Sequence, residues 1–235
     1  AMNMRVAVDL RCLLEPFESG VTIYTKAMVD EFLKIPDLEL DLFYQARVRC
    51  EAIHVRYPHV RHVLLSNTAF HLRSLLRFPP LPADYFLVKP DLIWLPDRRP
   101  FYRTKIPVVM TVHDQVPELF QGSLSLKGRV WHRLFSLKGL KGFCSGLLFP
   151  SLTVAHAVHT KLPWEVTYEG AQLSKTMVKP KGVPAGDFVL SLAPLDPRKR
   201  LAWFFTLAKR FPKVDFVCAG IKVQDSRFSS FKIPQ

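Results

Sequence analysis

Short apolar runs of strand length, separated by helix-like segments, constrain the fold of this chain more than any other feature. Asp91–Leu95 (DLIWL) and Val108–Val112 (VVMTV) are nearly continuous apolar runs. Such runs are typical of central strands in a parallel sheet that helices cover on both faces. Their alternation with helical patterns predicts an α/β fold with a doubly wound, Rossmann-type parallel sheet.

The remaining elements and the domain boundaries follow from the same patterns. The segment 178–187 (VKPKGVPAGD) is rich in Pro, Gly and Lys and predicts a linker. We therefore expect an N-terminal domain over 1–177 and the first β-α-β unit of a second Rossmann-like domain over 188–235. Strands are predicted at 6–10, 38–44, 60–65, 91–95, 108–112, 146–149, 165–168, 188–192 and 214–219, and helices at 20–33, 68–77, 125–140, 152–162 and 199–211.

Charge and cysteine content restrict the class of partner. Lys and Arg number 33 against 20 Asp and Glu, which gives a net charge of +13. This excess favours phosphorylated ligands, acidic membrane surfaces or nucleic acid. The chain lacks a recognisable DNA- or RNA-binding motif, so nucleic acid ranks last. The four cysteines are far apart and predict reduced thiols in a cytoplasmic protein, with neither disulfides nor a metal site. We expect no signal peptide, because the N-terminus enters strand-like MRVAVDL directly.

Ligands of such folds bind beyond the carboxyl ends of the strands, which directs attention to the first loop. Gly20 lies where the loop after the first strand enters a helix, so backbone N–H groups there could approach an anion. Thr22 and Tyr24 add hydroxyl groups, and Arg11 belongs to the same loop region. A glycine at a helix start is more often only a turn or a cap, and that alternative stays open.

A second candidate pair follows the central strand. His113 and Asp114 come directly after VVMTV, at the edge where a ligand is expected. An imidazole there could donate a hydrogen bond to a substrate hydroxyl or relay a proton, and Asp114 could orient or cap the loop. The alternative is a histidine that is satisfied by backbone groups at the end of a strand.

A third candidate lies late in the chain, in FVLSLAPLDPRKRLAWFFTLAKRF. Arg198 and Lys199 are predicted between a strand and the N-terminus of a helix. Cationic side chains, free N–H groups and the helix dipole would then converge, which suits a diphosphate. Solvated basic residues are the alternative.

The segment 123–143 (SLSLKGRVWHRLFSLKGLKGF) interleaves cations with large apolar residues. A helix with this pattern can lie on an anionic membrane surface, as a peripheral contact at its inner face. A packing helix with a solvated basic face explains the pattern at least as well. No apolar run approaches the roughly 20 residues of a membrane span.

Three segments, taken in order, resemble the family-4 retaining glycosyltransferases of the GT-B fold: MRVAVDLRCLLEPFESGVTIYTKAMVDEFL, PVVMTVHDQVPELF and FVLSLAPLDPRKRLAWFFTLAKRFPKVDFVCAG. The resemblance implies transfer of a hexose from a nucleotide sugar to a lipid-linked or polysaccharide acceptor, in cell-envelope polysaccharide or glycolipid synthesis. It implies that His113 contacts the reacting sugar and that Lys199, with Arg198, holds the donor diphosphate. No metal or other cofactor is expected, because fixed cations can stabilise the leaving group.

The sequence also departs from that family. Its first loop has Thr22 where the family has a second glycine, and 221–235 lacks the family's acidic Glu-Gly-Phe-Gly-like segment. The resemblance therefore implies that the donor domain is largely missing. The alternative function is a non-catalytic GT-B-like remnant that acts as a binding or assembly subunit.

Overall fold

A computed structural model of the chain describes residues 3–16, 18–66, 89–101, 104–120, 126–170, 178, 181–192 and 199–219, without the side chains of 117, 127 and 141. The structure divides into two compact units, Ala1–Gly170 and Ala171–Gln235. The boundary falls a few residues before 177, the end of the first domain that the sequence predicted. The predicted helix at 68–77, Arg198 and the segment 221–235 lie outside the described residues.

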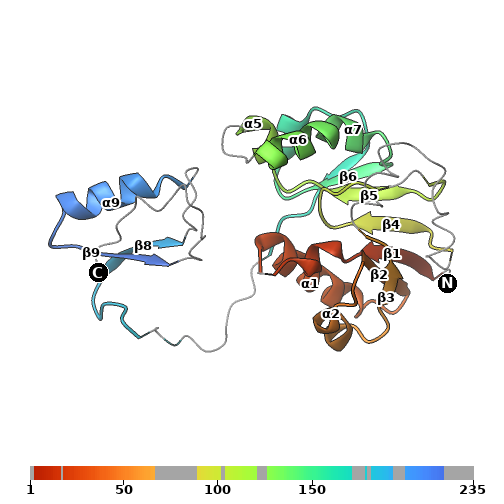
Figure 1. The fold of residues 1–235 in the computed structure, drawn as a ribbon, viewed down its shortest axis with the longest axis horizontal. Helices are drawn as coiled ribbons and strands as arrows, with labels where there is room; N and C mark the ends of the chain where they lie inside the picture. The colour runs from red at the N-terminus through yellow and green to blue at the C-terminus, as the bar shows by residue number, and fades with distance from the viewer. Residues whose placement is uncertain are drawn as a thin grey trace. The chain divides into compact units, whose positions relative to one another are not determined.

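The first unit has an α/β, Rossmann-like fold around a seven-stranded, all-parallel sheet (Figure 1). The strand order is β3-β2-β1-β4-β5-β6-β7, so the chain reverses direction across the sheet between β1 and β4. The strands are β1 Met4–Asp9, β2 Leu38–Ala46, β3 Arg61–Leu64, β4 Leu92–Leu95, β5 Val108–Thr111, β6 Gly146–Phe149 and β7 Trp164–Val166.

Helices flank this sheet. The elements α1 and α2 lie beside the β1–β3 half, and α5, α6 and α7 are grouped near β5 and β6 (Figure 1). The helices described in the first unit are the 3-10 helix η1 Arg11–Leu14, α1 Gly20–Phe32, α2 Glu51–Arg56, α5 Val116–Leu119, α6 Leu126–Leu134, α7 Leu137–Lys141 and α8 Leu152–Val158. Among the described residues, no helix is long and apolar enough to cross a membrane.

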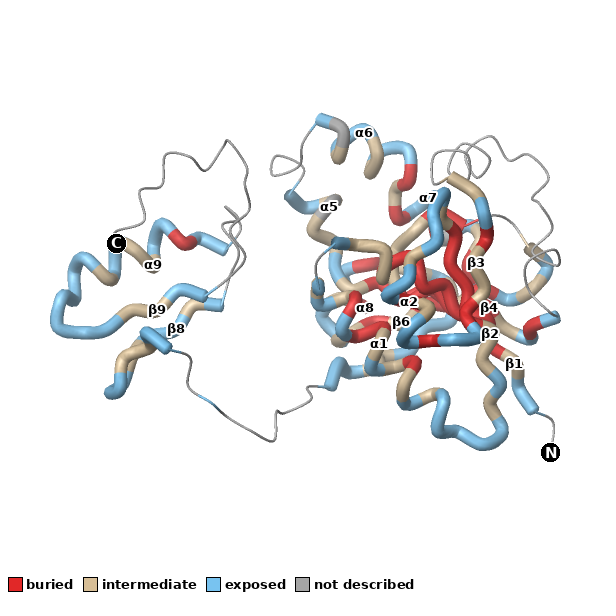
Figure 2. Tube along the Cα trace, turned by 60° about the horizontal axis from the view of Figure 1, so that its bottom comes forward, coloured by how far each residue is buried: buried red, intermediate tan, exposed pale blue. Residues whose placement is uncertain are grey.

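The core is formed by the strands that the sequence predicted to be central. Figure 2 shows the buried residues concentrated along the sheet. Ile93 and Leu95 of β4 are at most 1% exposed in one core cluster, and Trp94 between them, which points to the opposite face, is 2% exposed in the other. This burial on both sheet faces explains why these strands read as continuous apolar runs rather than as an alternating pattern.

Two helix predictions were wrong. A single helix was predicted at 125–140, but α6 ends at Leu134 and α7 begins at Leu137. The break occurs because the Ser136 hydroxyl accepts a hydrogen bond from the Gly139 amide and so caps a new helix. The helix predicted at 152–162 ends at Val158, because His159 takes a left-handed conformation (φ 43°) that stops the helix.

The second unit contains a parallel β-α-β unit, as predicted. Its elements are β8 Phe188–Leu192, α9 Leu201–Arg210 and β9 Asp215–Ala219. Helix α9 packs on the sheet through Phe204, whose ring lies 5.2 Å from that of Phe216. The helix begins at Leu201 rather than at the predicted Lys199, because Arg200 precedes it in a left-handed conformation (φ 50°).

Candidate functional site

A cleft of about 300 Å³ opens at the carboxyl ends of β4 and β5 in the first unit. It lies beside the point between β1 and β4 where the strand order reverses. In open parallel sheets this switch point is where ligands bind, because the loops after two neighbouring strands leave in opposite directions there. The cleft is lined by Val21, Asp97, Arg98, Arg99, Pro100, His113, Asp114, Trp131 and His132.

His113 lies in this cleft, but protein groups hold both of its ring nitrogens. Its Nε2 is 2.8 Å from the carbonyl oxygen of Pro96, and its Nδ1 is 2.6 Å from Oε1 of Glu169. Tyr24 packs edge-on against the ring at 4.9 Å between centroids. A carbonyl and a carboxylate both accept, so both contacts are hydrogen bonds only when both ring nitrogens carry a proton. The ring must therefore release one partner before it can bond to a ligand, and its predicted contact with substrate stays a prediction.

Asp114 is exposed at the edge of the cleft and holds the loop that follows β5. Its Oδ1 accepts a hydrogen bond from the amide of Val116, the first residue of α5. This bond turns the chain as it leaves β5, and the predicted part of Asp114 in the candidate site stays a prediction. The bond links the residue after the end of β5 to the first residue of α5, so both strand-end residues of the predicted pair have structural partners.

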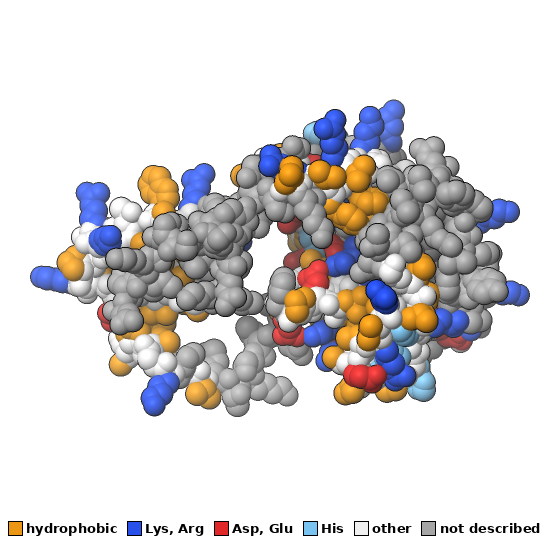
Figure 3. All heavy atoms as spheres, in the orientation of Figure 1, with side chains coloured by type: hydrophobic (Ala, Val, Ile, Leu, Met, Phe, Trp, Pro, Cys, Tyr) orange, Lys and Arg blue, Asp and Glu red, His pale blue; other side chains and the backbone are white. Residues whose placement is uncertain are grey.

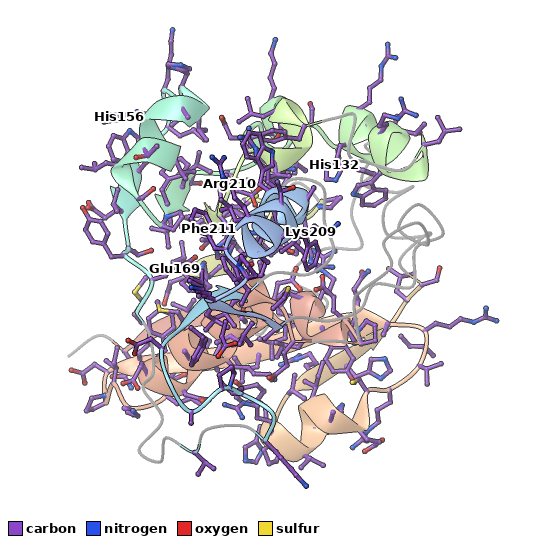
Figure 4. The ribbon with its side chains drawn as sticks, turned by 90° about the vertical axis from the view of Figure 1, so that its left-hand side faces the viewer. His132, His156, Glu169, Lys209, Arg210 and Phe211 are labelled. Carbon is purple, nitrogen blue, oxygen red and sulfur yellow. The ribbon has the colours of Figure 1, made fainter. Side chains whose placement is uncertain are left out.

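Arg98 connects three elements at the cleft. Its Nη1 donates to both carboxylate oxygens of Glu118, at 2.8 and 2.7 Å, and its Nη2 lies 3.3 Å from Nδ1 of His132. A guanidinium can only donate, so Nδ1 of His132 accepts and the neutral ring carries its proton on Nε2. Burial, followed by the charge of Arg98, lowers the pKa of His132. His132, on α6, and Glu169, after β7, are labelled in Figure 4.

Arg99 is likewise held by carboxylates. Its Nε donates to Asp97 at 2.8 Å, and its Nη2 donates to Glu15 at 2.6 Å. Burial opposes the charge of Arg99, but the neighbouring carboxylates, Asp97 first among them, raise its pKa above the ordinary value. Neither arginine therefore faces the cleft as a bare cation, although the whole chain is strongly basic.

Arg11 lies beneath the cleft rather than in it. Its side chain is 2% exposed, and its Nε donates to both oxygens of Asp9, which is 3% exposed. Its Nη2 also donates to the carbonyl oxygen of Pro100 at 2.9 Å. Arg11 thus ties the loop after β1 to the loop after β4, and only the second of these loops lines the cleft.

The start of α1 is a capping arrangement. Ser19 is the N-cap, its hydroxyl accepts from the Thr22 amide, and the Thr22 hydroxyl accepts from the Ser19 amide at 2.8 Å. A Cβ added to Gly20 would meet no atom within 4 Å. Tyr24 is buried against His113 and does not line the cleft. The structure therefore brings Tyr24 of the first-loop region into contact with His113 at the end of β5, but by packing of α1 and not by placing both side chains in the cleft.

Lys199 belongs to the second unit, where it is exposed just before α9. Its predicted partner Arg198 lies outside the described residues. Lys199 and His113 belong to different units, and the predicted relation between them stays a prediction. Within the described part of the chain, no three His, Cys, Asp or Glu side chains form a group that could hold a metal ion.

Sequence reasoning missed Asp97, Arg98, Arg99 and His132. The first three follow β4 by the same strand-end rule that found His113, so the motif DRR after DLIWL was a usable signal. His132 follows no strand and only the packing of α6 brings it to the cleft. No protein-family model matches this sequence, and no curated protein matches it either.

Proposed function

We propose that this chain is a retaining glycosyltransferase, in which the cleft of the first unit receives the acceptor. The observation that carries the proposal is the cleft itself, because it lies at the switch point of a Rossmann-like sheet and is lined by the predicted pair His113 and Asp114. The ordered resemblance of three sequence segments to GT-B enzymes supports the reaction class.

The side chains of the cleft favour a neutral, hydroxyl-rich ligand. Arg98 and Arg99 are bound by carboxylates, so a phosphate would have to compete with Glu118, Asp97 and Glu15. Asp97 and Asp114 offer acceptor oxygens for hydroxyl groups, and Trp131 contributes an aromatic surface. A sugar hydroxyl group of a lipid-linked or polysaccharide acceptor fits these features better than an anion does.

The donor side of the proposal depends on Lys199. An exposed cation next to the N-terminus of α9 would stabilise the diphosphate that leaves as the sugar is transferred. In this scheme the C–O bond between the sugar and the diphosphate breaks, the acceptor hydroxyl oxygen forms the new C–O bond, and its proton passes to the oxygen of the departing diphosphate. The sugar keeps its anomeric configuration, and no metal ion is needed for the step.

The test compares a donor-site variant with a matched control. Melting curves of the full chain with GDP-, UDP- and dTDP-sugars should show stabilisation by one nucleotide class, which Lys199→Ala should reduce. Lys209→Ala removes another exposed cation, at the opposite end of α9 (Figure 4), and should leave the shift unchanged. Product analysis with simple glycoside acceptors then distinguishes transfer from binding. If none of the nucleotide sugars raised the melting temperature, the result would contradict the proposal.

A binding or assembly subunit is the second candidate. It is favoured by the engagement of Arg98, Arg99 and both nitrogens of His113 by protein groups, which leaves them arranged for structure rather than for proton transfer. Glycoside binding in the cleft without any turnover of a bound nucleotide sugar would support this function over transfer.

A further inference from the structure

Five large apolar side chains are exposed on α5, at the residue that follows it and on α6, and the two helices are in contact with each other. We call this surface the α5–α6 ridge. On α6 they occur at i, i+4 and i+8, the spacing that places side chains on one face of a helix. The ridge consists of Leu119 (69% exposed), Phe120 (50%), Leu126 (72%), Val130 (52%) and Leu134 (51%).

The packing of α6 on the domain does not account for this face. The helix contacts the core through Trp131, which packs against the cluster that contains Phe135, with 4.4 Å between the two rings. Leu126, Val130 and Leu134 do not belong to this cluster, and each is more than half exposed. A helix that only covers a sheet buries its apolar stripe, whereas Leu126, Val130 and Leu134 of α6 are each more than half exposed.

Exposed cations lie on the helices that carry and flank the ridge, and the carboxylates beside them are Glu118 on α5 and Asp114 just before it. Arg129, Arg133 and Lys138 are exposed on α6 and α7. The sequence has no Asp or Glu between Glu118 and Glu165, although Lys and Arg occur there six times. Glu118 itself is bound to Arg98. Figure 3 shows hydrophobic and basic side chains gathered over this side of the first unit.

An apolar strip beside cations is complementary to a lipid bilayer with anionic headgroups. A second copy of the chain is less suited, because a symmetric contact through the ridge would bring Arg129 and Arg133 of one copy close to those of the other. We propose that the α5–α6 ridge docks on anionic bilayers, with its apolar side chains inserted between the headgroups and its cations bound to them.

Docking would also place the cleft at the membrane. Helix α6 carries the ridge on one face and contributes Trp131 and His132 to the cleft on another. A lipid-linked acceptor could then enter the cleft without leaving the bilayer. This consequence rests on the proposed function, whereas docking itself does not.

The test is co-sedimentation of the full chain with vesicles of phosphatidylcholine, with and without phosphatidylglycerol. Binding should require phosphatidylglycerol and should weaken between 0.1 and 1 M NaCl, over which the Debye length falls from about 10 to about 3 Å. The variant Leu126→Gln/Val130→Gln/Leu134→Gln should bind at least about 10-fold more weakly, because three inserted side chains lose their apolar burial.

A matched control changes exposed apolar residues elsewhere in the same unit. Val48, Val55 and Leu64 are 74%, 81% and 76% exposed, and changing all three to Gln should leave vesicle binding unchanged. Circular dichroism establishes that both variants are folded. Arg129→Gln/Arg133→Gln should reduce the preference for phosphatidylglycerol.

Wild-type binding by the ridge variant would overturn the proposal, as would equal binding to both kinds of vesicle. If analytical sedimentation showed that the wild type forms a dimer and that the ridge variant does not, the ridge would be an interface with a second copy of the chain. That result would also overturn the proposal. The vesicle assay contains neither donor nor acceptor, so its result is independent of sugar transfer. Vesicle binding can fail while the glycosyltransferase proposal stands, and vesicle binding can be observed while that proposal fails.

Discussion

Removing Arg11 should destabilise the first unit strongly, because it leaves the Asp9 carboxylate buried without its cation. The two side chains are 2% and 3% exposed. Breaking a buried ion pair from one side costs roughly 3–5 kcal/mol, since the remaining charge has no water to solvate it. Arg11→Met keeps the length and the apolar stem of the side chain, so the loss reports mainly the charge.

Removing both charges should cost less than removing one. In Asp9→Asn/Arg11→Met, the Asn side chain can still accept from the amide of residue 11, as Asp9 does now at 3.0 Å. The double variant leaves the Asn amide and the Pro100 carbonyl without the guanidinium, at about 1 kcal/mol each. We therefore expect a loss of about 2 kcal/mol, smaller than that of Arg11→Met alone.

Urea unfolding measured by tryptophan fluorescence gives the free energies of unfolding of the wild type, of Arg11→Met and of Asp9→Asn/Arg11→Met. Trp203 is in the second unit, so a Trp203→Phe background confines the signal to the first unit, where Trp94 is buried. Glu39→Gln, which removes an exposed partner of Arg5, is the control and should change the free energy of unfolding far less than Arg11→Met does. A loss below about 1 kcal/mol for Arg11→Met, or a double variant less stable than the single one, would refute the reasoning.

Three further predictions concern single positions. Burial raises the pKa values of Cys12 and Cys144 to about 12, so neither should react with a thiol reagent at pH 8 before unfolding. Exposed Cys218 should react at once, and Cys50 is of intermediate exposure. Rapid reaction of three of the four thiols would contradict this, because the third would have to be Cys12 or Cys144. Gly20→Ala should raise the free energy of unfolding by up to about 1 kcal/mol, because the new methyl group meets open space at a helix start, and a lower melting temperature would show that the glycine is needed. The pKa of His132 is lowered in the folded state, so its contribution to stability is complete above its unfolded value near 6.5 and is lost as the pH falls through the lower folded value. His132→Gln should flatten that decline in urea titrations, and an unchanged pH profile would exclude the effect.

The sequence alone determined the fold class and the place to look for a site. Strands buried on both faces leave continuous apolar runs, so DLIWL and VVMTV could be assigned as central strands from their residue types and length. Because parallel strands end at one edge, the position of His113 at that edge followed as well. These features are local, or depend only on the direction of neighbouring strands.

Tertiary structure decided what surrounds His113 and which faces of α6 are covered. Pairing of β4 with β5 brings Arg98 and Arg99 to the same cleft, and the packing of α6 adds His132 from a segment that follows no strand. Helical periodicity locates the stripe that contains Val130, but it cannot tell whether another element buries it. Burial and ion pairing depend on groups that are distant in the sequence, and only the folded chain brings them together.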